Sequence, residues 1–134
     1  MNFDDLVTEK TIQLWYRRLH DEDLDVLVDV LRKSKVLEEL HLRDNQLTLV
    51  DGKFTDALAH NNTLNHLYLG CNHIGAKGAK RLSDALKVNK TLEKLNLDGN
   101  EIGDEGAKHI ADALMENVTL EDINLDSNDI GDEG

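Results

Sequence analysis

Histidine and cysteine side chains are the first candidates for chemistry in this chain, because both bind zinc. The sequence has six histidines and a single cysteine, Cys71. His41 and His66 occupy neighbouring positions in two related segments, where they could share a zinc ion with Cys71 as a third ligand. Two or three ligands from unlike positions give a metal site little support, and we expect neither a metal nor another cofactor.

Other short motifs also point away from catalysis. The segments 98–103 (DGNEIG) and 126–131 (DSNDIG) resemble the start of a calcium-binding loop, but isoleucine stands at the fifth position, which must supply an oxygen ligand. Gly75-x-x-Gly78 lacks the following Lys-Ser/Thr of a phosphate-binding loop. No serine, cysteine or paired-carboxylate set with positioned partners is recognisable. We therefore predict a protein without enzymatic activity.

Three Asn-x-Thr triplets, at 61–63, 89–91 and 117–119, match the acceptor sequence for N-glycosylation. The acidic start of the chain has no apolar core of a signal peptide. We therefore interpret the triplets as turn and capping residues.

An internal repeat explains all of these motifs. Three copies of the pattern L-x-x-L/I-x-L-x-x-N-x-I-G follow one another at a spacing of 28 residues: LNHLYLGCNHIG (64–75), LEKLNLDGNEIG (92–103) and LEDINLDSNDIG (120–131). A related copy, LEELHLRDNQL (37–47), begins 27 residues before the first of these, and a degraded copy precedes it. From about residue 9 onward, the chain is built of repeats.

Each unit predicts a short strand followed by a helix. The L-x-x-L-x-L segment alternates apolar and polar residues, as in a strand with one buried face. Apolar residues then recur at helical spacing, for example over 79–86 and 107–114. The asparagine after each strand is expected to be buried and to bond backbone groups where the chain turns. No unit can bury its strand face alone, so the units must stack on one another.

This pattern resembles the ribonuclease-inhibitor-like class of leucine-rich repeat proteins. The resemblance implies an α/β fold, a right-handed curved solenoid with parallel strands on its concave face and helices on its convex face. We expect a single domain over residues 1–134, made of a divergent N-terminal capping repeat, three full repeats and a partial repeat, in the order 1–36, 37–63, 64–91, 92–119 and 120–134.

The two ends depart from the repeat pattern. The segment 15–18 (WYRR) stands where later units carry small or acidic residues and the asparagine, as expected of a cap. We expect Phe3, Leu6 and Val7 to cover the first strand as a short helix or strand. The last unit has a strand but no helix, which leaves an apolar end bare. Either the chain is a fragment of a longer solenoid, or this end docks on another chain.

Polar strand positions of successive units are expected to line up as rows on the concave face. These residues are free of any role in the core and therefore available for recognition. Trp15 and Tyr68 stand out, because aromatic and arginine side chains are frequent interface anchors. We predict that a protein binds this face through the following residues: Trp15, His41, Arg43, His66, Tyr68, Lys94, Asn96, Asp98, Asp122, Asn124 and Asp126.

Acidic residues are concentrated in the C-terminal part. The chain carries a net charge of −12, and residues 98–134 hold 12 carboxylates against one basic residue, Lys108. Solubility alone is one explanation. The other is a protein partner whose basic surface faces this end. The negative field disfavours nucleic acid, and no apolar run suits a membrane. A single cysteine and no signal peptide predict a cytoplasmic location.

The leading hypothesis is a non-enzymatic protein-interaction module or scaffold that uses the concave strand face or the open C-terminal end. One alternative is a GTPase activator similar to the Ran GTPase-activating proteins, with Arg17, Arg18 or Arg43 touching a nucleotide-bound switch. Another is a fragment of a larger leucine-rich repeat receptor, such as an innate-immune sensor.

Overall fold

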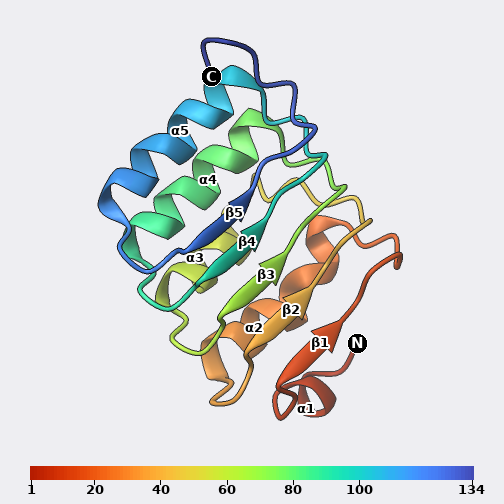
Figure 1. The fold of residues 1–134 in the computed structure, drawn as a ribbon. Helices are drawn as coiled ribbons and strands as arrows, with labels where there is room; N and C mark the ends of the chain where they lie inside the picture. Colours follow the sequence, from red (N-terminus) through yellow and green to blue (C-terminus); the bar gives the residue numbers. More distant parts are fainter.

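The structure, a computed structural model, describes residues 1–134 as a stack of strand–helix units (Figure 1). All strands are parallel and form one sheet in their chain order: β1 (Thr11–Gln13), β2 (Glu39–His41), β3 (His66–Tyr68), β4 (Lys94–Asn96) and β5 (Asp122–Asn124). Equivalent residues of successive repeats lie side by side, as Leu67 does between Leu40 and Leu95. The repeat spacing therefore translates directly into strand register.

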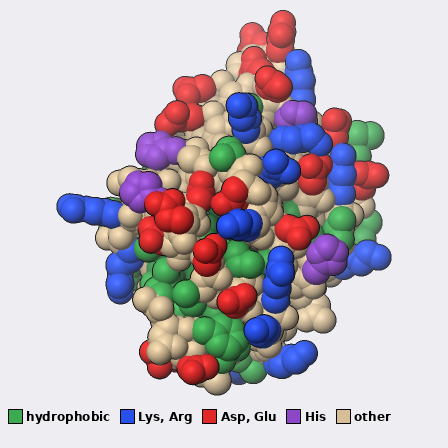
Figure 2. Space-filling view, turned by 180° about the vertical axis from the view of Figure 1, so that it is seen from behind, with side chains coloured by type: hydrophobic (Ala, Val, Ile, Leu, Met, Phe, Trp, Pro, Cys, Tyr) green, Lys and Arg blue, Asp and Glu red, His purple; other side chains and the backbone are tan.

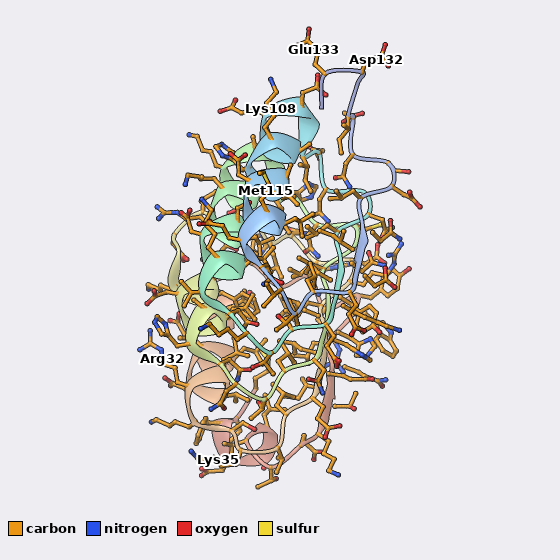
Figure 3. The ribbon with its side chains drawn as sticks, turned by 60° about the vertical axis from the view of Figure 1, so that its left-hand side comes forward. Arg32, Lys35, Lys108, Met115, Asp132 and Glu133 are labelled. Carbon is orange, nitrogen blue, oxygen red and sulfur yellow. The ribbon has the colours of Figure 1, made fainter.

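The helices form a second layer on one face of the sheet (Figures 1 and 3). They are α1 (Phe3–Leu6), the 3-10 helix η1 (Asp21–Leu24), α2 (Asp25–Lys33), α3 (Lys53–His60), α4 (Gly75–Val88) and α5 (Gly103–Glu116). From α2 to α5, each helix packs against the next. The predicted α/β solenoid is confirmed. None of the helices combines the length and the apolar character that crossing a membrane requires.

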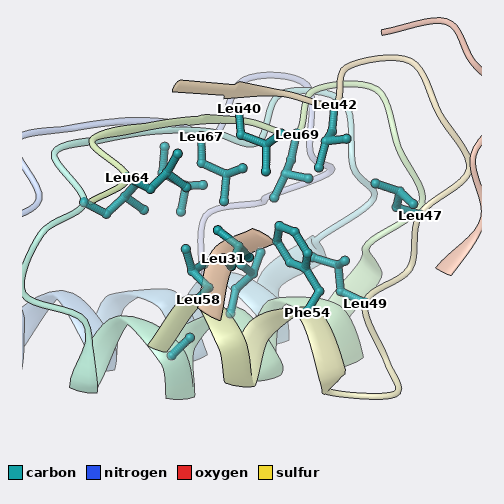
Figure 4. Close-up of a cluster of buried hydrophobic side chains, with 14 of the residues drawn as sticks. Leu31, Leu40, Leu42, Leu47, Leu49, Phe54, Leu58, Leu64, Leu67 and Leu69 are labelled. Carbon is teal, nitrogen blue, oxygen red and sulfur yellow. The ribbon is translucent and has the colours of Figure 1, made fainter. Parts of the chain in front are cut away.

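Leucines from both layers meet in the core (Figure 4). Leu40 and Leu67 of the strands face Phe54 and Leu58 of α3, and all four side chains are at most 2 % exposed. Burying a side chain of this size stabilises the fold by roughly 1.5–3 kcal/mol. Because every unit contributes the same positions, the core runs continuously along the stack.

A buried asparagine follows β2, β3, β4 and β5 and ties neighbouring units together. The amide nitrogen of Asn100 donates to the carbonyl oxygens of Leu69 and Leu97, at 2.9 and 3.0 Å. Its amide oxygen accepts from the backbone N–H groups of Asn72 and Ile74, at 3.2 and 3.4 Å. The predicted role of these asparagines is confirmed for the whole set: Asn45, Asn72, Asn100 and Asn128.

A second set of asparagines closes the turns after the helices. Asn89 donates to the carbonyl oxygen of Leu58 at 2.7 Å and accepts from the N–H groups of Thr91 and Leu92, at 2.9 and 2.8 Å. Asn61 and Asn117 make the same bonds in their units. These are the first residues of the Asn-x-Thr triplets, so their predicted turn and capping role is confirmed.

At the two ends the packing is less complete. The N-terminal segment forms the helix α1, which packs against α2 with Phe3 and Leu6 half-buried. At the other end, Leu114 of α5 is 37 % exposed, although the equivalent Leu86 of α4 is fully buried. The helical spacing over 107–114 places Leu114 among the buried positions. In the structure Leu114 is partly exposed, because no further helix lies beside α5.

Candidate protein-binding face

Polar side chains line the sheet face opposite the helices, which we call the concave face. The strand register places them in two rows that run across all strands. The first row is Gln13, His41, Tyr68, Asn96 and Asn124, and the second is Thr11, Glu39, His66, Lys94 and Asp122. The predicted rows are therefore confirmed by the register.

A third row lies just beyond the strands and is also held by backbone hydrogen bonds. The N–H of Tyr16 donates to the carbonyl oxygen of Arg43 at 3.1 Å, and the N–H of Asp44 donates to that of Gly70 at 3.0 Å. The parallel ladder thus continues past the strand ends and fixes the backbone of this row, which consists of Trp15, Arg43, Gly70, Asp98 and Asp126.

Aromatic rings gather on the N-terminal part of the concave face. The rings of His41 and Tyr68 are stacked, with centroids 4.4 Å apart and 14° between their planes. Trp15 meets His41 in a T-shaped arrangement at 6.0 Å. Trp15 and Tyr16 remain 42 % and 71 % exposed. These rings border a hollow of about 340 Å³, here called the aromatic hollow, lined by Trp15, Tyr16, His41, Arg43, Tyr68 and Asn96.

Arg43 forms a polar wall of the aromatic hollow, and acceptors surround its guanidinium group. Its Nη1 donates to Oδ1 of Asp98 at 2.8 Å, its Nη2 donates to Sγ of Cys71 at 3.2 Å, and its Nε lies 3.4 Å from Oδ2 of Asp44. The hydrogen bond with Asp98 is the main cause that raises the pKa of Arg43. This end of the face is consequently less basic than the sequence suggests, because two carboxylates balance its arginine.

Gly70 makes the ion pair between Arg43 and Asp98 possible. In the third row Gly70 lies between these two residues, so the arginine side chain spans one whole repeat to reach its partner. A Cβ atom on Gly70 would overlap both Nη1 of Arg43 and Oδ1 of Asp98. Any side chain at this position would therefore displace the bridge.

Glu39 lies between the two histidines of the concave face. Its Oε2 is 3.4 Å from Nε2 of His41, and its Oε1 is 3.0 Å from Nδ1 of His66. These hydrogen bonds lower the pKa of Glu39, and the bond with His41 has the larger effect. His41, His66 and Cys71 do not converge, because both histidines turn to Glu39 and the cysteine faces Arg43. No group of three or more histidine, cysteine, aspartate or glutamate side chains is placed to hold a metal ion.

The remaining predicted residues lie toward the acidic end of the face. A smaller hollow of about 140 Å³, next to Tyr68, is lined by Lys94, Asn96, Asp122 and Asn124. Asp126 is exposed and borders neither hollow. The structure thus brings most of the predicted residues into two adjoining groups, an aromatic one and a polar one, whereas His66, Asp98 and Asp126 line neither hollow.

The sequence prediction omits five residues of this arrangement: Tyr16, Glu39, Asp44, Gly70 and Cys71. Glu39 and Gly70 belong to the predicted rows, but their residue types alone do not reveal what they contact. Tyr16 and Cys71 have positive φ angles of 58° and 53°. In a strand, side chains point alternately to the two faces of the sheet. A residue in this left-handed conformation interrupts the alternation, so the strand pattern does not predict that Tyr16 and Cys71 lie on the concave face. The one usable signal is that Tyr16 adjoins Trp15.

Comparison with known proteins identifies the class. The family model described as Leucine Rich repeat matches residues 33–53, 60–83, 88–111 and 116–134. The chain therefore belongs to the leucine-rich repeat family. No curated protein sequence matches it.

Two solved structures show the same fold. The structure titled "Leiomodin-1 Actin-Binding Site 2 (ABS2)" has a TM-score of 0.82 at 24 % identity, with 92 % of this chain and 73 % of that chain covered. The tropomodulin C-terminal domain of Caenorhabditis elegans has a TM-score of 0.76 at 16 % identity, with 91 % and 76 % covered. Identities this low establish a shared fold. They do not assign the ribonuclease-inhibitor-like subclass.

Proposed function

We propose that this chain is a non-enzymatic protein-interaction module that holds its partner on the concave face. The observation that carries the proposal is the aromatic hollow, where Trp15 and Tyr16 remain exposed on a backbone fixed by hydrogen bonds. Exposed aromatic side chains on a rigid surface supply large contact areas at little entropic cost, and such residues dominate binding energy at interfaces.

The partner we propose presents a basic surface toward the C-terminal end. Asp122 and Asp126 project from the acidic part of the concave face, and neither forms an ion pair within the chain. On the opposite, helix-covered side, Figure 2 shows acidic and basic side chains interspersed over the middle and acidic ones predominating at the upper end. A polarised field of this kind steers a basic partner and fixes its orientation. It suits neither nucleic acid nor an anionic membrane, and we propose a cytoplasmic setting.

Actin is the first specific partner to test. The support is the fold shared with a structure whose title describes an actin-binding site, that of leiomodin-1. The GTPase-activator alternative is not favoured. Among its three proposed arginines, Arg43 is already bound to Asp98 and Cys71, and both Arg17 and Arg18 lie outside the aromatic hollow.

Docking through the C-terminal end is the second candidate, whether in a larger receptor or with another chain. It is favoured by apolar side chains that α5 and the following turn leave exposed. Met115, labelled in Figure 3, is 86 % exposed, and Val118 is 90 % exposed. Exposed apolar side chains gathered at one site are typical of association surfaces.

Affinity capture from a cell lysate separates the two surfaces. The parent is compared with Trp15→Ala/Tyr68→Ala on the concave face and with Met115→Ala/Val118→Ala at the C-terminal end. We expect a protein that the parent and the second variant retain and the first variant loses. Loss from the second variant alone would move the binding surface to the C-terminal end. Co-sedimentation of the same three proteins with purified actin filaments tests actin directly.

A further inference from the structure

We propose, building on the concave-face function, that the aromatic hollow is an anchoring pocket for an aromatic side chain carried by a basic segment of the partner. The volume of about 340 Å³ lies at the lower end of the range for ligand pockets, so it suits one or two side chains rather than a large ligand. The bonds of Arg43, the rings of the wall and the charge beside the hollow determine the chemistry of that side chain.

The surroundings of Arg43 disfavour an anion. A free arginine would bind a carboxylate or phosphate with both terminal nitrogens. Here Nη1 donates one of its two N–H groups to Asp98 and Nη2 donates one of its two to Cys71, so a single N–H remains on each terminal nitrogen. Asp44 and Asp98 also lie against the guanidinium group and would repel a second negative charge. Arg43 therefore contributes to the wall of the hollow a guanidinium group whose charge two carboxylates already balance.

The walls of the hollow match an aromatic ring. Ring pairs prefer offset-stacked or T-shaped contacts, and the wall already contains both, between His41 and Tyr68 and between Trp15 and His41. A guanidinium plane also stacks on aromatic faces. At the rim, the amide oxygen of Asn96 accepts from the N–H of Asp98, while its amide nitrogen makes no hydrogen bond within the chain and is free to donate to a partner's carbonyl.

The acidic residues beside the hollow determine which charge the partner's segment should carry next to its aromatic side chain. Toward β5 the concave face carries Asp122 and Asp126 without cationic partners within the chain, and Lys94 is the one basic side chain among the predicted residues there. A segment with its ring in the hollow and lysine or arginine residues toward β5 would therefore meet opposite charge.

The experiment uses Trp15, the single tryptophan of the chain, as a fluorescent reporter inside the hollow. The probes are N-acetyl-phenylalaninamide, N-acetyl-leucinamide and acetate. We expect a saturable change in Trp15 emission with the phenylalanine probe, half-complete on the order of 1 mM. The leucine probe should bind about three- to tenfold more weakly, since it lacks ring–ring contacts. Acetate should give no saturable change. Adding two lysines after the phenylalanine should tighten binding in a salt-sensitive way.

Two matched glycine variants test the wall. Gly70→Ala displaces Arg43 and should weaken the phenylalanine probe at least threefold. At Gly131 a Cβ atom would meet nothing closer than Asp104 at 3.5 Å, so Gly131→Ala should leave binding unchanged. Equal binding of the leucine and phenylalanine probes, competition by acetate, or the absence of saturation would overturn the proposal.

Failure of this inference is distinguishable from failure of the proposed function. A lysate partner lost from Trp15→Ala/Tyr68→Ala, combined with no binding of the phenylalanine probe, would overturn the aromatic anchor and leave the concave-face function standing. Saturable probe binding, combined with partners that the same variant retains, would remove the function and with it the hollow's role as an anchor.

Discussion

Replacing Gly70 with alanine should break the ion pair between Arg43 and Asp98 without disturbing the sheet. A Cβ atom on Gly70 would overlap the ends of these two side chains. Both ends can rotate away, whereas no backbone atom is among the nearest neighbours. The expected response is therefore a displaced guanidinium group on an intact strand stack.

The magnitude follows from two opposing contributions. Replacing glycine by alanine where the backbone is compatible stabilises a protein by about 0.4–1 kcal/mol, because the unfolded chain loses freedom. A hydrogen bond to a charged group contributes about 1.5–3 kcal/mol. The Arg43 side chain is 43 % exposed, so solvent screening reduces that figure to about 1 kcal/mol. Gly70→Ala should therefore leave the free energy of unfolding nearly unchanged. Gly131→Ala should raise it by the full amount of about 0.4–1 kcal/mol that alanine gains over glycine.

The assay is thermal and urea unfolding of the parent and both glycine variants, repeated in an Asp98→Ala background. We expect the two variants to differ by about 1 kcal/mol, which corresponds to roughly 3–5 °C in Tm for a chain of this length. In the Asp98→Ala background the difference should vanish, because the pair is already broken. An equal difference in both backgrounds would refute the role of Gly70 in this bridge.

The remaining predictions concern the asparagine ladder, the core and the histidine–glutamate cluster. Asn100→Ala should lower the free energy of unfolding by about 3 kcal/mol in urea titrations, since it leaves buried backbone groups unpaired, whereas exposed Asn62→Ala should have little effect. Leu67→Ala should cost about 2–5 kcal/mol by the same measurement, against less than about 0.5 kcal/mol for Met115→Ala. Glu39→Gln should lower Tm at pH 7. Its histidine bonds lower the pKa of Glu39 below the ordinary 4.5, so the difference from the parent should persist down to about pH 4.5 and disappear as the pH falls through the lowered pKa. A difference that stays constant as the pH is lowered would contradict that assignment.

The repeat pattern predicts most of the fold because each unit contacts only its neighbours. In such a chain the spacing of 27 or 28 residues fixes which strands pair and in what register. The same spacing identifies the buried asparagines, because a polar residue that recurs after each strand from β2 to β5 must bond to the same backbone groups in each of those units. Long-range structure is thus encoded in a local pattern.

The contacts of the candidate site are not predictable in this way, because they differ from unit to unit. The Arg43 side chain passes the one intervening repeat to reach Asp98. It can do so only because Gly70, which lies between the two residues, has no side chain. Glu39 binds two histidines that belong to different strands. Each of these contacts depends on the side-chain conformations of several neighbours, which periodicity does not specify.

The structure separates the residues that hold the solenoid together from those that face outward on the sheet. The leucines and asparagines that recur from unit to unit are buried in most units, so they account for the stability of the stack. Trp15 and Tyr16 have no aromatic counterpart at the equivalent positions of the other units, remain exposed, and adjoin an arginine whose charge is already balanced. A surface of exposed rings beside a neutralised cation adds little to folding. It would add much to binding once a partner excludes water from it, because the rings and the guanidinium face are already held in place.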